Sequence, residues 1–116
     1  MHPERGVDAV PVVFALDGRR IFLPIDRVKA KRTTRLRRLR NLEADPRCVL
    51  LVESYTDDWE DLWWVRVHAQ GSQCPAERLA DAVSALERRH PRYTEPGSIA
   101  TVIELVADTI TGWAAR

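Results

Sequence analysis

Two short apolar runs separated by an Asp-Gly pair constrain the fold of this chain more than any other feature. Val10–Leu16 is rich in β-branched and aromatic residues, and Arg20–Ile25 has the same character. Asp17-Gly18 lies between them, and such a pair accepts the positive φ values of a tight hairpin turn. We therefore expect these two runs to form a pair of antiparallel strands.

The remaining segments predict two helices and three further strands. Leu36, Leu39 and Leu42 recur at helical spacing, and Asp45-Pro46 ends that helix because the residue before proline avoids the α region. Arg47–Tyr55 is almost continuously apolar, which is typical of a strand in the middle of a sheet or lining a barrel. The other expected elements are strands at Leu62–Gln70 and Ser98–Thr111, the latter long enough to carry a bulge, and a helix from Pro75 to His90.

Composition limits the chain to one small domain, residues 1–116, with a mainly β fold and two helices. Of its residues 45% are hydrophobic and 30% charged, and the net charge is +1, as in a soluble globular protein. No stretch approaches the roughly 20 apolar residues of a membrane span, so we expect a cytoplasmic protein with no membrane partner. The histidines and cysteines show no metal-ligand spacing, so no metal site is expected; they are His2, His68, His90, Cys48 and Cys74.

Tryptophans are concentrated in one stretch of the chain. Trp59, Trp63 and Trp64 lie within six residues, and Trp113 lies near the C-terminus. Each indole removes on the order of 150–250 Å² from water when it packs. These residues are therefore expected to anchor either the small core or an interface.

The strongest indication of function is a basic segment built into the fold. Seven of the twelve residues in Lys29–Arg40 are Lys or Arg, and no acid lies between Arg27 and Leu42. Cations before the first turn of a helix are unfavourable by roughly 0.3–1 kcal/mol each, because the helix N-terminus already carries positive partial charge. A bound anion reverses that sign, since the free amide groups and the side chains then point at one negative charge. The segment therefore predicts a phosphate site.

Two other interpretations of the basic segment remain open. It can be a solvated helix whose arginines pair with Glu43, Asp45 or the acidic loop Thr56–Asp61. It can also bind nucleic acid through the phosphate backbone. The near-neutral charge of the whole chain and the acidic loop argue against nucleic acid as a partner.

Four strings in this order carry a family resemblance: VPVVFALDGRRIFLPID, KAKRTTRLRRLRNLEADPRCVLLVESY, DWEDLWWVRV and a final GWAAR. They resemble the pyridoxamine 5′-phosphate oxidase-like split barrels, and most closely the actinobacterial branch that binds the deazaflavin coenzyme F420. The most specific parts are K-x-K-R-T, R-N-L-E-A-D-P-R and D-W-x-x-L-W-W-V-R. The resemblance covers nearly the whole chain.

The resemblance implies a six-stranded split β-barrel, similar to FMN-binding proteins, that forms a homodimer with cofactor sites between the subunits. It implies that Lys31, Arg32 and Thr33 hold the cofactor phosphate, with Lys29 and Arg37 in support. It also places the cofactor ring along the preceding strands and against a tryptophan. Those further cofactor-binding residues are Val12, Val13, Ile25, Asp26 and Trp64.

The implied function is an F420-binding oxidoreductase that passes a hydride from the reduced deazaflavin to a small organic substrate. The alternatives are an FMN-binding protein of the same fold and a cofactor-binding module without turnover. No Ser/His/Asp set, carboxylate pair or activated cysteine identifies a catalytic residue. Family members carry a helix and a strand where this chain has only Met1–Ala9, so we expect a shortened N-terminus. The barrel is then closed differently, covered by the partner subunit, or left with an open strand edge.

Overall fold

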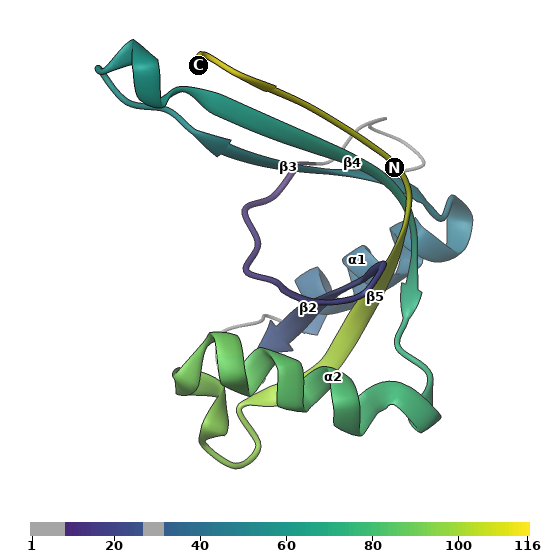
Figure 1. Ribbon diagram of the computed structural model, residues 1–116. Coiled ribbons are helices and arrows are strands. Elements are labelled where there is room, and N and C mark those ends of the chain that lie inside the picture. Colours follow the sequence, from purple (N-terminus) through teal and green to yellow (C-terminus); the bar gives the residue numbers. More distant parts are fainter. Residues whose placement is uncertain (1–8, 27–31) are drawn as a thin grey trace.

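The computed structural model describes residues 9–26 and 32–116, with the backbone alone at residues 26 and 32–36 (Figure 1). Five strands form one antiparallel sheet in the order β1-β2-β5-β4-β3. The mainly β fold with two helices is confirmed. The strands are β1 (Ala15–Asp17), β2 (Arg20–Asp26), β3 (Arg47–Ser54), β4 (Trp63–Gln73) and β5 (Ile99–Ala114), and the helices are α1 (Arg32–Ala44), η1 (Trp59–Asp61), α2 (Ala76–Arg89) and η2 (Pro91–Thr94).

The hairpin at Asp17-Gly18 forms, but its first strand is shorter than the sequence predicts. Asp17 pairs with Arg20, so Gly18 and Arg19 are the two loop residues, and Gly18 has a φ of 61°. A type II′ turn needs positive φ at this first loop position, and glycine adopts it without a steric penalty. Residues 9–14 precede β1 without regular secondary structure.

The expected barrel is not closed in the described part of the chain. β1 and β3 lie at opposite edges of the five-stranded sheet and do not pair with each other. The apolar run that forms β3 predicts a strand in mid-sheet or in a barrel wall, and this prediction is wrong for the isolated chain. Only Leu50 of β3 is buried, whereas Val49 and Leu51 are 53% and 57% exposed, because nothing in the described residues covers their face.

β5 is long and bulged, as its composition allows. His68 pairs with Thr109 but Ala69 with Ala107, so Asp108 is the extra residue of a bulge. The Arg19 guanidinium donates to the carbonyls of Ala107 (2.8 Å) and Asp108 (3.4 Å) across this point. Beyond the bulge the end of β5 separates from β2 and continues with β4 and β3 as a projecting ribbon (Figure 1). We call this ribbon, residues 47–70 and 107–114, the arm.

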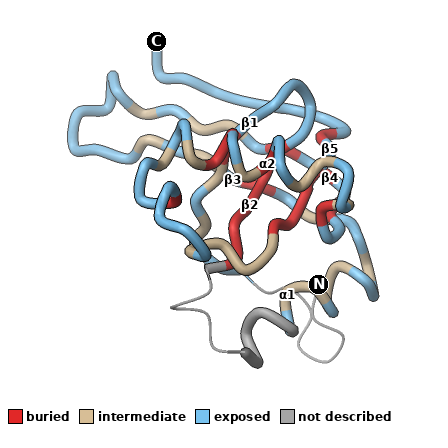
Figure 2. Tube along the Cα trace, turned by 90° about the horizontal axis from the view of Figure 1, so that it is seen from below, coloured by how far each residue is buried: buried red, intermediate tan, exposed pale blue. Residues whose placement is uncertain are grey.

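Two clusters of buried side chains lie on opposite faces of the sheet, and burial is concentrated in β2, β5 and α2 (Figure 2). On one face Leu39 and Leu42 of α1 pack against the larger cluster, as their spacing predicts. The other face is covered by α2, whose Ala82, Ala85 and Leu86 are buried. The larger cluster consists of Ile21, Leu23, Ile25, Leu50, Val67, Ala69, Ile103, Leu105 and Ala107.

A glycine sets how closely α1 approaches the sheet. A Cβ on Gly71 would lie 2.7 Å from the Leu105 Cδ2 atom and 3.0 Å from the Leu42 Cδ2 atom. Leu42 therefore occupies the space above β4 that a side chain at position 71 would need. At the end of α1, Asp45 accepts bonds from the Arg47 amide (3.1 Å) and guanidinium (3.0 and 2.8 Å), and this hydrogen bonding lowers the pKa of Asp45 to about 2.

One carboxylate is buried under α2. Glu104 of β5 is 3% exposed and accepts two hydrogen bonds from Arg78, at 2.7 and 2.8 Å. It also forms an ion pair with Arg20 at 3.0 Å. The hydrogen bonds from Arg78 lower the pKa of Glu104 more than burial raises it. The bidentate pair of Arg78 and Glu104 therefore fixes α2 to β5, and Arg20 links β2 to the same carboxylate. Among the described helices, none is long and apolar enough to cross a membrane.

Candidate functional site

α1 brings the basic segment to one side of the sheet. Its first turn contains no acidic residue, and Arg37 and Arg40 are exposed on its surface. The helix begins at Arg32, so Arg32 and Thr33 lie in the first turn, where backbone amide groups have no partner within the helix. This arrangement leaves free backbone donors at the N-terminal end of a helix that exposes two arginines further along.

Arg38 is a further candidate site residue, which the spacing of the basic residues did not indicate. It is half-buried, and within residues 9–26 and 32–116 its Nε atom is buried with no hydrogen-bond partner. It lies one turn before Leu42, on the helix face that approaches Gly71. A buried donor without an acceptor is unfavourable by about 1–3 kcal/mol, so this atom is suited to receive an acceptor from a ligand.

The other residues predicted to bind the cofactor differ in burial and in the elements that carry them. Val12 is half-buried against the larger cluster and Val13 is 42% exposed, both in the irregular segment before β1 rather than in a strand. Ile25 is 2% exposed, so it offers a ligand only its backbone, and Asp26 ends β2 beside a bulge. Lys29 and Lys31 lie outside the described residues.

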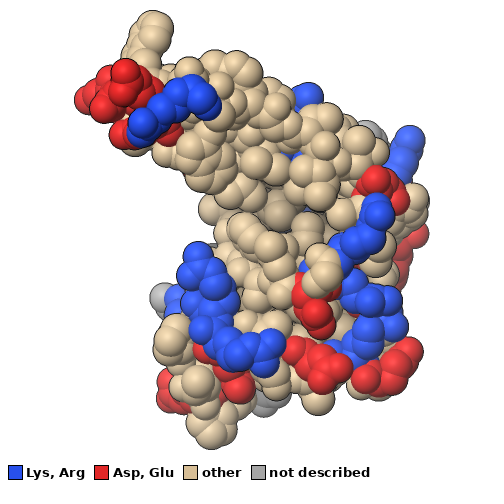
Figure 3. Space-filling view, in the orientation of Figure 1, with Lys and Arg blue, Asp and Glu red and all other residues tan. Residues whose placement is uncertain are grey.

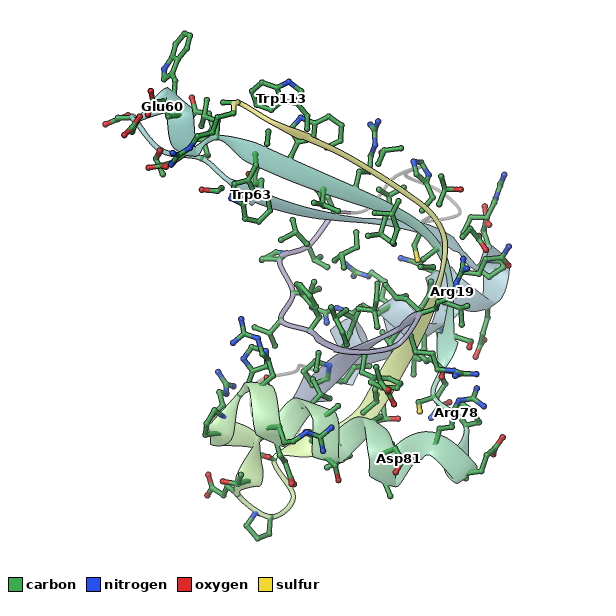
Figure 4. All side chains as sticks on the ribbon, viewed as in Figure 1. Arg19, Glu60, Trp63, Arg78, Asp81 and Trp113 are labelled. Atoms are coloured by element: carbon green, nitrogen blue, oxygen red, sulfur yellow. The ribbon has the colours of Figure 1, made fainter. Side chains whose placement is uncertain are left out.

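Within a single chain, Trp64 and α1 lie on opposite faces of the sheet. Its neighbour Val65 packs against the larger cluster, and because side chains alternate along a strand, Trp64 faces the opposite side of the sheet. There it pairs with Trp113 of β5, and the Arg66 guanidinium lies 5.2 Å from the centre of its ring. Trp63 and Trp113 project from the arm, well away from α2 (Figure 4).

The molecule is hollowed between the arm and the body that carries α2 (Figure 3). The irregular segment 9–14 runs along this hollow, and Phe14 is tied to α2 through its carbonyl, 2.9 Å from the His90 Nε2 atom. Basic residues gather at the same end of α2, at the rim of the hollow; they are Arg88, Arg89 and Arg92. Arg88 and Arg89 in the last turn of α2 also lie at the end of the helix where the dipole favours cations.

A second opening lies at the end of the arm and suits no phosphate. It has a volume of about 450 Å³, and its charged lining includes Glu60 and Asp61, with Asp61 paired to Arg116 at 3.3 Å. Carboxylates at the rim repel a phosphate group. Across the ranges 9–26 and 32–116, no group of three or more His, Cys, Asp or Glu side chains is arranged to hold a metal ion.

Comparison with known proteins shows a likeness at the level of the fold. The chain is similar to a crystal structure of an FAD-binding protein from Mesorhizobium loti, with a TM-score of 0.58 and 18% sequence identity. The match covers 89% of this chain and 73% of that protein. No family model matches the sequence, and no curated protein matches it either. At this identity the likeness defines the class of fold, a mainly β architecture that an FAD-binding protein also has.

Proposed function

We propose that this chain binds a phosphate-bearing flavin-type cofactor and acts as an oxidoreductase, with coenzyme F420 as the cofactor and FMN as the alternative. The observation that carries the proposal is the buried Arg38 Nε atom, which has no partner among the described residues, on a helix whose first turn has no acid. The fold that the chain shares with an FAD-binding protein supports a cofactor of the flavin type.

The donor set fits a phosphate. Arginine provides a planar fork of donors that matches phosphate oxygens, and the amide groups of the first turn of α1 add uncharged donors. Under the proposal, the phosphate would be held by Lys31, Arg32, Thr33 and Arg38, with Lys29 and Arg37 contributing charge. When bound, a reduced deazaflavin supplies a hydride from its C5 position.

The chain's own part is to bind and orient. The irregular segment 9–14, held to α2 by His90, would border the ring of the cofactor, and the half-buried Val12 would supply an apolar wall. Under this proposal the protein is a cytoplasmic homodimer that acts on a small organic substrate. Trp64 would reach the cofactor of a neighbouring subunit, because it faces away from α1 in its own chain.

Cofactor titration tests the proposal. Fluorescence or absorbance titration with F420, FMN and FAD should give saturable binding of at least one of them, and competition between F420 and FMN ranks the two. Replacing Lys31 and Arg32 together by Ala should weaken binding at least tenfold, because two charge-assisted contacts to phosphate are lost. Unchanged affinity in this double variant contradicts the proposed phosphate site.

A matched control is available at the other basic group. Replacing Arg88 and Arg89 by Ala removes the same charge from the last turn of α2 and should leave affinity within about threefold. Equal loss in both double variants would mean that binding depends only on overall charge. A cofactor that binds but never reoxidises with any acceptor tested identifies the third alternative, a module without turnover.

A further inference from the structure

The outer edge of β3 exposes main-chain groups at alternate residues. The Gly71 amide donates to the Pro46 carbonyl at 2.8 Å, which makes Pro46 and Gly71 a hydrogen-bonded pair. Because such pairs alternate along an antiparallel ladder, the even-numbered residues of β3 bond to β4 and the odd-numbered residues point outward. The Arg47 amide follows this rule, since it points away from β4 and donates to the Asp45 side chain.

The outward groups of Val49, Leu51 and Glu53 have no hydrogen-bond partner within the described parts of the chain. The side chains of Val49 and Leu51 are also more than half exposed. Natural sheets protect such an edge with lysine, proline, a bulge or a covering element. From Cys48 to Val52 this strand has neither charge nor proline, and it pairs with β4 without a bulge. The edge therefore has the composition of a covered strand.

We propose that β3 pairs in antiparallel fashion with β3 of a second copy of this chain, so that the two arms form one continuous sheet. With the two-fold axis at Leu50, Val49 of one copy lies opposite Leu51 of the other, and Arg47 lies opposite Glu53. Apolar residues then meet apolar residues, and at each end Glu53 of one copy lies beside Arg47 of the other, whose guanidinium also pairs with Asp45 of its own chain. Val49 and Leu51, whose main-chain groups point outward, form the hydrogen-bonded pairs in this register, whereas the Arg47 amide already donates to Asp45. A two-fold symmetric contact requires a surface that is complementary to itself, and the sequence of β3 meets this requirement.

This inference names the surface that joins the proposed homodimer, and it does not depend on the cofactor. Its direct readout is amide hydrogen exchange by NMR at two protein concentrations, with sedimentation equilibrium giving the oligomeric state. At high concentration the amides of Val49 and Leu51 should be protected, and dilution to monomer should remove that protection. The amides of Leu50 and Val52, which bond to β4, should stay protected at both concentrations. A dimer in which Val49 and Leu51 exchange freely overturns the inference while leaving the homodimer standing; a monomer at all concentrations overturns both.

Substitutions separate the edge from the rest of the arm. Val49→Lys places a charge at the centre of the edge and should abolish the dimer with the fold intact, because position 49 is already exposed. Ile110→Lys makes the same change on β5, two strands away and 65% exposed, and should leave the dimer unchanged. Dissociation by Ile110→Lys but not by Val49→Lys would place the interface elsewhere and overturn the inference.

A charge swap tests the register itself. Glu53→Arg sets two arginines opposite each other at both ends of the contact and should raise the dimer dissociation constant roughly tenfold. Adding Arg47→Glu restores opposite charges across the contact and should recover part of the loss, although it also removes the pair between Arg47 and Asp45 within each chain. Failure of this rescue, in a double variant that remains folded by circular dichroism, rules out the register centred on Leu50. Cofactor titration of the same variants then shows separately whether the proposed function stands.

Discussion

Glu104 is the only charged side chain that is buried within the described parts of the chain. Two hydrogen bonds from Arg78 and an ion pair with Arg20 compensate for its removal from water. A buried carboxylate with this many donors holds its surroundings in one arrangement, because any shift leaves charge without a partner. The burial of this carboxylate could not be predicted from the sequence, because a single acid within an otherwise apolar run does not show which arginines will pair with it.

Glu104→Gln should lower the free energy of unfolding at neutral pH by about 2 kcal/mol, because the amide keeps the shape but loses two charge-assisted contacts. The pKa of Glu104 is lowered in the folded state, so its contribution is complete above its ordinary pKa of 4.5 and is lost as the pH falls through the folded value. Urea denaturation from pH 3 to 7 should therefore show a smaller loss of stability below pH 4.5 in the variant than in the wild type.

Glu77→Gln is the matched control for that measurement. Glu77 lies 4.0 Å from the same Arg78 but its side chain is 73% exposed, so solvent screens the pair. The substitution should leave stability and its pH dependence nearly unchanged. Equal effects at positions 77 and 104 would show that burial of the carboxylate is not what matters.

Arg38→Met separates binding from folding. Methionine keeps most of the length of the arginine side chain and removes the buried Nε donor that has no partner in the described residues. Thermal unfolding without cofactor should therefore shift upward, by the equivalent of about 1 kcal/mol. The affinity for a phosphate-bearing cofactor should fall at the same time, as measured by titration. A stability loss with unchanged affinity would assign Arg38 a purely structural role.

At the scale of elements, α1 depends on a missing side chain in β4. Gly71→Ala brings a methyl group against Leu42 and Leu105 and should lower the free energy of unfolding by about 1 kcal/mol, because both contacts are flexible side-chain ends. Gly71→Val should displace α1 and weaken cofactor binding as well. Ser72→Ala, at the exposed next position, is the control, and equal stability of the three variants would contradict close packing of α1 at this point.

Local signals predicted most elements, and long-range relations between them were harder to predict. The Asp-Gly turn, the leucine spacing of α1 and Pro46 each act within a few residues, so the hairpin and the helix end are found where the sequence indicates. The position of β3 at a sheet edge depends on which strands pair across the whole chain, and an apolar run is compatible with either place. Arg38 was missed as a site residue because its burial arises from packing against the sheet, which the charge pattern does not show.

At the scale of the whole molecule, all four tryptophans lie on the arm or at its end, and the core between β2, β5 and α2 has none. Trp59 is 78% exposed and Trp113 50%, and the end of β5 is exposed throughout. Segments with few buried contacts open at lower free energy than the core. Indole fluorescence should therefore report on the arm, and far-UV circular dichroism on the two helices.

In dilute protein, urea should change the fluorescence at a lower concentration than it changes the circular dichroism. Raising the protein concentration should bring the two transitions together, because the proposed pairing of the arms would add stability where the monomer lacks it. Coincident transitions at every concentration would mean that the arm and the core unfold as one unit.

The extra residue at Asp108 separates two parts of β5, one that lies in the core and one that lies in the arm. Before it, Ile103, Leu105 and Ala107 point to the core; after it, Ile110 pairs with Val67 on that same side, so the parity of inward positions changes from odd to even. Deleting Asp108 would leave Ala107 opposite Ala69 and Thr109 opposite His68, so the ladder would become uniform and Trp113 would stay beside Trp64. What the deletion would remove is the local bend that a bulge introduces, at the point where β5 passes from the core into the arm.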